Sequence, residues 1–142
     1  MQLTLIRNTD SEMSTAYRIA RVVYAETLAA SLRVVEALTS MIYNVAKFTG
    51  HDFMEIIGDC RMFESLNANS ARHKYLYADS QTRDFQMCVR VAKRMLKGNL
   101  ADACCGAVRF HRAEYLPDWA VARGYIADID GLLFYLAGDG DE

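Results

Sequence analysis

The sequence is poor in the features that divide a chain or fix it to a membrane. It has one proline, Pro117, and neither a glycine- or serine-rich linker nor an internal repeat, so we predict a single domain over residues 1–142. No apolar run approaches the ~20 residues that span a bilayer, and no membrane span is predicted. Residues 1–13 contain Asp10 and Glu12 and do not resemble a signal peptide. We expect synthesis in the cytoplasm, with action elsewhere depending on export or release.

An excess of charge of one sign is also missing. The chain carries 16 basic and 18 acidic residues, a net charge of −2, and a general nucleic-acid binder would instead show a basic surface. Neither G-x-x-x-x-G-K-S/T nor G-x-G-x-x-G occurs, and the isolated histidines, His51, His73 and His111, form no metal-ligand pattern. We therefore expect no nucleic-acid partner, no metal and no bound nucleotide.

The cysteines show no redox or zinc motif. Cys60, Cys88, Cys104 and Cys105 include no C-x-x-C pair, which favours reduced, partly buried thiols. A disulfide from Cys60 or Cys88 to the adjacent pair stays open if the protein is exported. A thiol nucleophile on Cys60, Cys104 or Cys105 with His111 as its partner is a further alternative, although no local motif supports it.

Helical patterns dominate the first hundred residues, and the hydrophobic fraction of 52% is ample for a core. The predicted helices cover about 12–29, 32–48, 52–58 and 80–97, with a surface loop at 59–78. Gly50 is the expected stop of the second helix, and Asp52 with Glu55 matches a capping box before the third. The predicted inner residues are Leu32, Val35, Thr39, Ile42 and Ala46 in the second helix and Phe85, Cys88, Val89, Ala92, Met95 and Leu96 in the fourth. Thereafter we predict a strand or extended loop at 106–111, a loop at 112–124, and a helix or strand within 126–136. The expected fold is a mostly α, α+β domain with a small β or irregular portion near the C-terminus.

Glu26 occupies a helix position where an apolar side chain is expected. It shares one stripe, at the spacing of three and four that marks a buried face, with Ala16, Ile19, Ala20, Val23 and Ala30. A carboxylate facing a core is costly unless it is paired, hydrogen-bonded or protonated, and a desolvated neutral acid is a proton donor. Glu26 is therefore either a general acid or a structurally satisfied buried glutamate. Candidate carboxylate partners are Glu36, Asp59, Glu64, Glu114 and Asp118.

Aromatic residues concentrate after the helical half, at Phe63, Phe110, Tyr115, Trp119, Tyr125, Phe134 and Tyr135. Exposed rings can stack on sugar faces, whereas buried rings fill a core. We expect Phe110, Phe134 and Tyr135 to be core residues. Trp119, beside Pro117 in a polar loop, is the better candidate for a saccharide groove.

A series of short motifs resembles the SleB-like, spore-cortex-lytic family of cell-wall hydrolases. The motifs are Tyr24-Ala-Glu-Thr27, Met41-Ile-Tyr-Asn44, Met62-Phe-Glu-Ser65, Met95-Leu-Lys-Gly98, Gly106-Ala-Val-Arg-Phe-His111, Pro117-Asp-Trp119 and Ile129-Asp-Gly-Leu-Leu-Phe-Tyr135, over residues 17–136. The resemblance implies a lysozyme-like, mostly helical fold that cleaves peptidoglycan without a metal or organic cofactor. The family's catalytic glutamate falls on Glu26, and the reaction is lytic transglycosylation or muramidase cleavage, while some relatives are labelled amidases.

The resemblance also implies a set of substrate-binding residues. These are Tyr24, Asn44, Phe63, Phe110, His111, Tyr115 and Trp119. In the implied mechanism Glu26, kept protonated by apolar neighbours, donates to the oxygen between N-acetylmuramic acid and N-acetylglucosamine. Its carboxylate then accepts a proton from the muramoyl C6 hydroxyl or from water.

Several positions depart from the family pattern. They are Ala25, Thr27, Val45, Val108, Arg109 and Leu132. Loss of small and polar groups around the site leaves an alternative open, namely a catalytically degenerate peptidoglycan-binding or phage-tail-like structural module. Such a module would belong to a phage-like particle or an envelope assembly. An active enzyme would instead reach the wall through a holin, in a phage-like particle, or on lysis of the producing cell.

Overall fold

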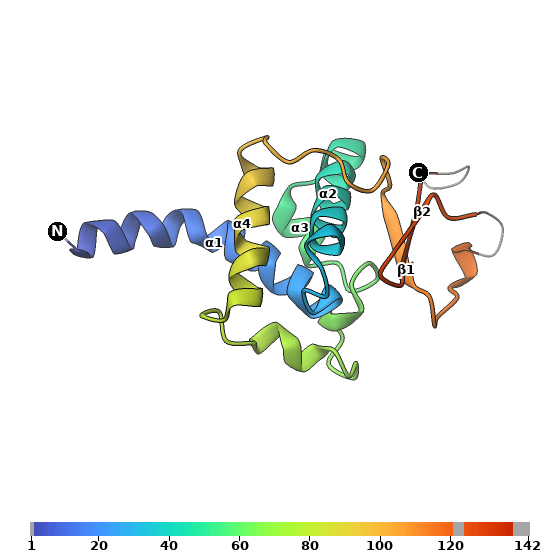
Figure 1. Cartoon of the computed structure of the whole chain (residues 1–142), viewed down its shortest axis with the longest axis horizontal. Coiled ribbons are helices and arrows are strands. Elements are labelled where there is room, and N and C mark those ends of the chain that lie inside the picture. Colours follow the sequence, from blue (N-terminus) through green and yellow to red (C-terminus); the bar gives the residue numbers. More distant parts are fainter. Residues whose placement is uncertain (1, 121–123, 138–142) are drawn as a thin grey trace.

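The computed structural model describes the backbone of residues 2–120 and 124–137, and the side chains of residues 15–120 and 124–137. Its elements are α1 (Gln2–Thr27), α2 (Leu32–Thr49), α3 (Phe53–Ile57), η1 (Glu64–Leu66), η2 (His73–Tyr77), α4 (Arg83–Leu96), β1 (Arg109–Arg112), η3 (Asp118–Ala120), β2 (Ala127–Ile129) and β3 (Leu132–Tyr135). The mostly helical α+β class is confirmed, with the small sheet near the C-terminus (Figure 1). Within the described residues, no helix combines the length and the apolar character that crossing a bilayer requires.

Helix α1 begins earlier and ends sooner than the predicted 12–29. No proline or glycine interrupts residues 2–27, so the helix extends toward the N-terminus and its first half projects from the body of the molecule (Figure 1). It ends at Thr27 because Leu28 and Ala29 both adopt a left-handed backbone, with φ of 53° each. The Thr27 hydroxyl accepts from the Ala29 N–H at 3.1 Å. Ala30 consequently lies outside the helix and is exposed, not part of the buried stripe.

Helices α2 and α3 have the ends that the sequence predicts. Ser31 caps α2 by accepting a backbone N–H of the first turn at 3.1 Å, and Gly50 closes it with a φ of 80°. Asp52 and Glu55 form the predicted capping box at the start of α3, with bonds of 2.9 and 3.1 Å. Leu32 was predicted to face inward but is exposed. It is the first residue of α2, and the buried residues of this helix begin at Val34.

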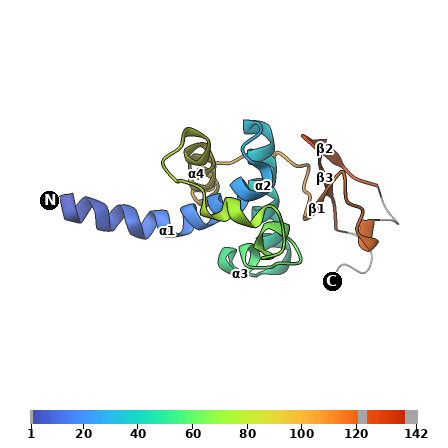
Figure 2. The same cartoon turned by 90° about the horizontal axis from the view of Figure 1, so that it is seen from below.

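The segment predicted as a surface loop, 59–78, is more ordered and more buried than expected. It forms η1 and η2, both of which contact α1, and Phe63 and Ser65 within it are fully buried. Phe63 packs against Phe110 of β1 with ring centroids 5.9 Å apart. Figure 2 shows this segment passing beside α1 toward the sheet. The 59–78 segment therefore packs against α1 on one side and against β1 on the other.

The ambiguous apolar run near the C-terminus forms strands. The sheet is antiparallel in the order β1-β3-β2, with Arg112 opposite Leu132 and Ile129 opposite Leu132 on the other side. Asp130 and Gly131 join β2 to β3 with φ values of 51° and 84°, the conformation of a type I′ hairpin turn. Of the strand or extended loop predicted at 106–111, the last three residues belong to β1, which ends at Arg112.

One hydrophobic cluster unites the helices and the sheet. Its members come from α1, α2, α3 and α4, from the 59–78 segment, and from all three strands. Of the predicted inner face of the fourth helix, Leu96 is half-buried and the other five residues are buried, namely Phe85, Cys88, Val89, Ala92 and Met95. The sheet lies at the end of the molecule opposite the start of α1 (Figures 1 and 2), and the C-terminal end of α1 is directed toward it.

Candidate functional site

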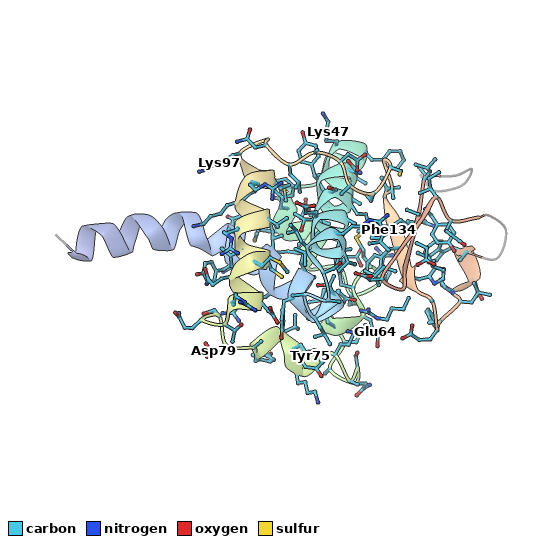
Figure 3. All side chains as sticks on the ribbon, in the orientation of Figure 1. Lys47, Glu64, Tyr75, Asp79, Lys97 and Phe134 are labelled. Atoms are coloured by element: carbon cyan, nitrogen blue, oxygen red, sulfur yellow. The ribbon has the colours of Figure 1, made fainter. Side chains whose placement is uncertain are left out.

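A cavity of about 800 Å³ lies where the end of α1, the 59–78 segment and the C-terminal strands meet. Its lining comes from Glu26, from positions between 60 and 72, and from positions between 110 and 119. Figure 3 labels Glu64 at this junction, where the loop after α3 approaches the sheet. The volume is within the range of about 300–1,000 Å³ typical of small-ligand sites.

Glu26 is at the base of this cavity with 1% of its side chain exposed, so the predicted burial is confirmed. Its Oε1 forms an ion pair with the Nη2 of Arg112, and its Oε2 accepts from the Ser65 N–H at 2.8 Å. The predicted apolar surroundings of the carboxylate are therefore wrong. Two polar donors, one of them a cation, compensate for the desolvation.

Arg112 connects two acidic side chains and is only 9% exposed. Its Nη1 donates to the Glu26 carbonyl at 2.7 Å, and its Nε donates to Glu64 Oε1 at 3.3 Å. Strand β1 places it there, because Arg112 is the last residue of β1 and pairs with the first residue of β3. A buried guanidinium is tolerated only when it is paired and hydrogen-bonded, and here each of its nitrogens has a partner.

Glu64 presents a second carboxylate to the same cavity, with 54% of its side chain exposed. The Ser70 hydroxyl donates to Glu64 Oε2 at 2.8 Å. This bond lowers the pKa of Glu64, partial burial acts in the opposite direction, and Arg112 lowers it further. Glu64 is therefore an ionised acceptor at neutral pH.

The backbone around Glu26 is held by arginines from outside α1. The last turn of α1 has no basic residue of its own, and Arg72 and Arg112 donate to the carbonyls of Ala25 and Glu26 at 3.3 and 2.7 Å. His73 Nδ1 lies 2.9 Å from the Ser65 carbonyl and donates to it, since a carbonyl can only accept. The two arginines thus hold the end of α1, and His73 holds the backbone of Ser65, the residue whose N–H binds Glu26.

A cluster of rings forms another side of the cavity. His111 Nδ1 donates to the Arg112 carbonyl at 2.7 Å, and its Nε2 lies 2.7 Å from the Tyr135 hydroxyl. Trp119 meets both rings edge-on, with centroids 5.7 and 5.0 Å away, and Arg109 lies over the Trp119 ring at 4.9 Å. Burial raises the pKa of Tyr135, which keeps its hydroxyl protonated. These contacts hold the end of β1 in position.

Four of the predicted substrate-binding residues line the cavity with Glu26. They are Phe110, His111, Tyr115 and Trp119. Tyr115 is strongly exposed and Trp119 is half-buried, whereas Phe110 is nearly buried between Phe63 and Phe134. The structure therefore brings together residues that are far apart in the sequence.

The other three predicted residues do not line it. Tyr24 packs against Phe85, with ring centroids 5.9 Å apart, and Phe63 is wholly buried in the core. Asn44 donates to the carbonyl of Ala107 at 3.1 Å and also contacts Cys104, so it fixes the segment before β1. None of the three lines the cavity, because α1 and α2 direct Tyr24 and Asn44 toward other elements, and Phe63, in the segment before η1, packs into the core.

Cys60 lines the cavity with His111, but the two ring nitrogens of His111 contact the Arg112 carbonyl and the Tyr135 hydroxyl, not a thiol. All four cysteines are free, with Cys60 and Cys105 exposed. Burial raises the pKa of Cys88 and Cys104 to about 12, so both are protonated thiols at neutral pH. His111 directs both ring nitrogens at other groups. Within the described chain, no three His, Cys, Asp or Glu side chains gather as a metal site.

Sequence reasoning missed Arg112, Arg72 and Ser65. A signal for Arg112 exists, because it alternates with Phe110 at the end of a strand-like run and a buried glutamate requires a cationic or hydrogen-bonding partner. Nothing in the sequence ranks it above the other arginines, since the pairing depends on how β1 meets α1.

Comparison with known proteins assigns no family to the chain. No protein-family model, curated protein or solved structure matches it. The chemistry of the cavity is therefore inferred from its own residues and from the motifs between Tyr24 and Tyr135.

Proposed function

We propose that this protein cleaves the glycan strands of peptidoglycan, as a muramidase or lytic transglycosylase, with Glu26 as the general acid and base. The observation that carries the proposal is a buried carboxylate at the base of a sugar-sized cavity whose other side presents Tyr115 and Trp119. The motif resemblance to SleB-like hydrolases, and the lysozyme-like fold that it implies, support the proposal.

The reaction requires a proton at the glycosidic oxygen. Glu26 donates it to the oxygen between N-acetylmuramic acid and N-acetylglucosamine as that bond breaks. Its carboxylate then accepts a proton from the muramoyl C6 hydroxyl, which gives a 1,6-anhydro end, or from water, which gives a reducing end. General acid–base catalysis of this kind typically contributes about 10²–10⁴ in rate.

The ion pair with Arg112 adds a step to this mechanism. In the ion pair Glu26 is a carboxylate with no proton to give, so Glu26 Oε1 separates from Arg112 when the strand enters and takes up a proton from solvent before it donates. Arg112 stays anchored by the Glu26 carbonyl at 2.7 Å and by Glu64 at 3.3 Å. The Glu26 side chain can therefore turn toward the cavity while the guanidinium keeps its place.

The cavity also offers the groups that a glycan strand needs. The rings of Tyr115 and Trp119 provide apolar faces for sugar rings. Arg61 lines the cavity as well and provides donors for acetamido and hydroxyl oxygens, and the side-chain oxygen of Asn67 can accept from hydroxyl and amide groups. This combination of aromatic faces and polar side chains suits a neutral, amide-bearing polysaccharide.

The test is digestion of purified sacculi by the wild type and by Glu26→Gln, followed by turbidity and by mass spectrometry of released fragments. We expect the substitution to reduce fragment release by about 10²–10⁴. Glu36→Gln is the matched control, because Glu36 also pairs with an arginine, Arg94, at 3.2 Å but lies outside the cavity. Equal release by wild type and Glu26→Gln, with both folded by circular dichroism, would remove Glu26 from the mechanism.

A non-catalytic glycan-binding module is the second candidate, and the Arg112 ion pair favours it. With Oε1 and Oε2 both accepting hydrogen bonds, Glu26 is held as a structural acceptor. Such a module would bind sacculi, as part of a phage-like particle or envelope assembly, and release nothing. Retention on sacculi without soluble fragments would support it, and freed stem peptides would assign the amide bond as the target instead.

A further inference from the structure

Two carboxylates of the cavity share one guanidinium. Resting on the proposed glycan cleavage, we propose that Glu64 is a second catalytic carboxylate, the base that takes a proton from an attacking water, so that the glycan is hydrolysed to a reducing end. The motif resemblance places only Glu26 in catalysis. Glu64 would decide which of the two products is formed.

The shared partner holds the two groups near one another before the strand enters. Glu26 contacts Nη2 of Arg112, and Glu64 contacts Nε at 3.3 Å. Carboxylates held by one guanidinium lie close enough to flank a single glycosidic bond, for which glycosidases use separations of roughly 5–9.5 Å. Glu114 and Asp118 also line the cavity, but the shared guanidinium singles out Glu64.

The environments of the two carboxylates differ as the two roles require. Glu26 is 1% exposed, whereas Glu64 is 54% exposed and faces the part of the cavity that water reaches. The Ser70 hydroxyl orients Glu64 at 2.8 Å, and each of its oxygens keeps a further lone pair for a water molecule. The lowered pKa of Glu64 agrees with a base that is ionised before the reaction.

The step balances as follows. The oxygen of water bonds to the anomeric carbon of the muramoyl residue while the bond from that carbon to the leaving sugar oxygen breaks. Glu26 gives its proton to the leaving oxygen, and Glu64 takes one proton from the water. One water is consumed, and exchange with solvent restores both carboxyl groups. Without Glu64 the C6 hydroxyl remains as nucleophile, and its attack yields the 1,6-anhydro end.

The experiment quantifies reducing and anhydro ends by mass spectrometry after the full chain digests sacculi. The wild type should release reducing ends. Glu64→Gln should lower their rate of formation by about 10²–10⁴ while anhydro ends continue to form at the wild-type rate or faster. Glu36→Gln should change neither product, and Glu26→Gln should suppress both.

Three outcomes would overturn the role of Glu64 and leave glycan cleavage standing. They are a wild type that makes only anhydro ends, a Glu64→Gln variant that forms reducing ends at the wild-type rate, and a folded variant that loses both products equally. If Glu64→Gln fails to fold, Glu64→Ala replaces it, and reducing ends at the wild-type rate in that variant would equally refute the proposal. A wild type that cleaves no glycan overturns the proposed function itself.

Discussion

Replacing Arg112 with methionine tests the interaction that organises the cavity. The substitution keeps much of the apolar stem but removes the cation, which leaves the Glu26 carboxylate buried with the Ser65 N–H as its remaining partner. Removing one partner of a buried ion pair typically lowers the free energy of unfolding by about 3–5 kcal/mol, because the other charge is left uncompensated. A domain of this size has a total of about 5–15 kcal/mol, so the loss should be large.

The assay is urea unfolding at neutral pH, followed by far-ultraviolet circular dichroism. Arg61→Met is the matched control, because Arg61 lines the same cavity and pairs with Asp59 at 3.3 Å, but 89% of its side chain is exposed. An exposed ion pair contributes about 0–1 kcal/mol, so the control should change stability little. The difference between the two variants isolates the effect of burial.

A double variant then identifies the partner. Arg112→Met alone leaves a buried carboxylate without its cation, but in Glu26→Gln/Arg112→Met a neutral amide replaces that carboxylate. We therefore expect the double variant to lose less stability than the sum of the two single substitutions. If Arg112→Met destabilises no more than Arg61→Met, or if the single effects simply add, the ion pair is not what holds Glu26 in place.

Three other perturbations test the supporting contacts by the same unfolding assay. Tyr135→Phe removes the hydroxyl 2.7 Å from His111 and leaves a buried ring nitrogen without its partner, for an expected loss of about 1–3 kcal/mol. Ser31→Ala removes the cap of α2, for a loss of about 1 kcal/mol. Because the pKa of Glu64 is lowered in the fold, its stabilisation is present above the usual value of 4.5 and is lost as pH falls through the lowered value. Ser70→Ala should weaken that acid dependence, and unchanged midpoints or an unchanged pH profile would contradict the respective contacts.

The helices and their caps were predictable because their signals are local. Ser31, Gly50 and the Asp52–Glu55 box lie within a few residues of the backbone groups that they satisfy. The C-terminal strands were left ambiguous because the apolar run alone fits a helix as well. The Asp130–Gly131 pair between apolar segments is the hairpin signal that decides for strands.

The site was predictable only in part, because the contacts between distant elements leave no local signal in the sequence. The burial of Glu26 follows from the helical period of α1, but its partner arrives from β1, and helical spacing carries no information on which strand meets which helix. For Asn44 the sequence motif predicted a contact with the site that the structure does not show. Its motif suggested a place in the substrate site, whereas α2 directs it to Ala107 and Cys104.

The ion pair itself is a poor device for stability, and this argues for a role toward a ligand. Replacing a buried ion pair by apolar residues of similar size is often neutral or stabilising. We therefore expect Glu26→Leu/Arg112→Met to unfold at the same or a higher urea concentration than the wild type, and to lose glycan cleavage. Both are measured on one preparation, by urea unfolding and by fragment release from sacculi. A double variant that is stable and still cleaves would show that the charges at the base of the cavity serve neither the fold nor the reaction.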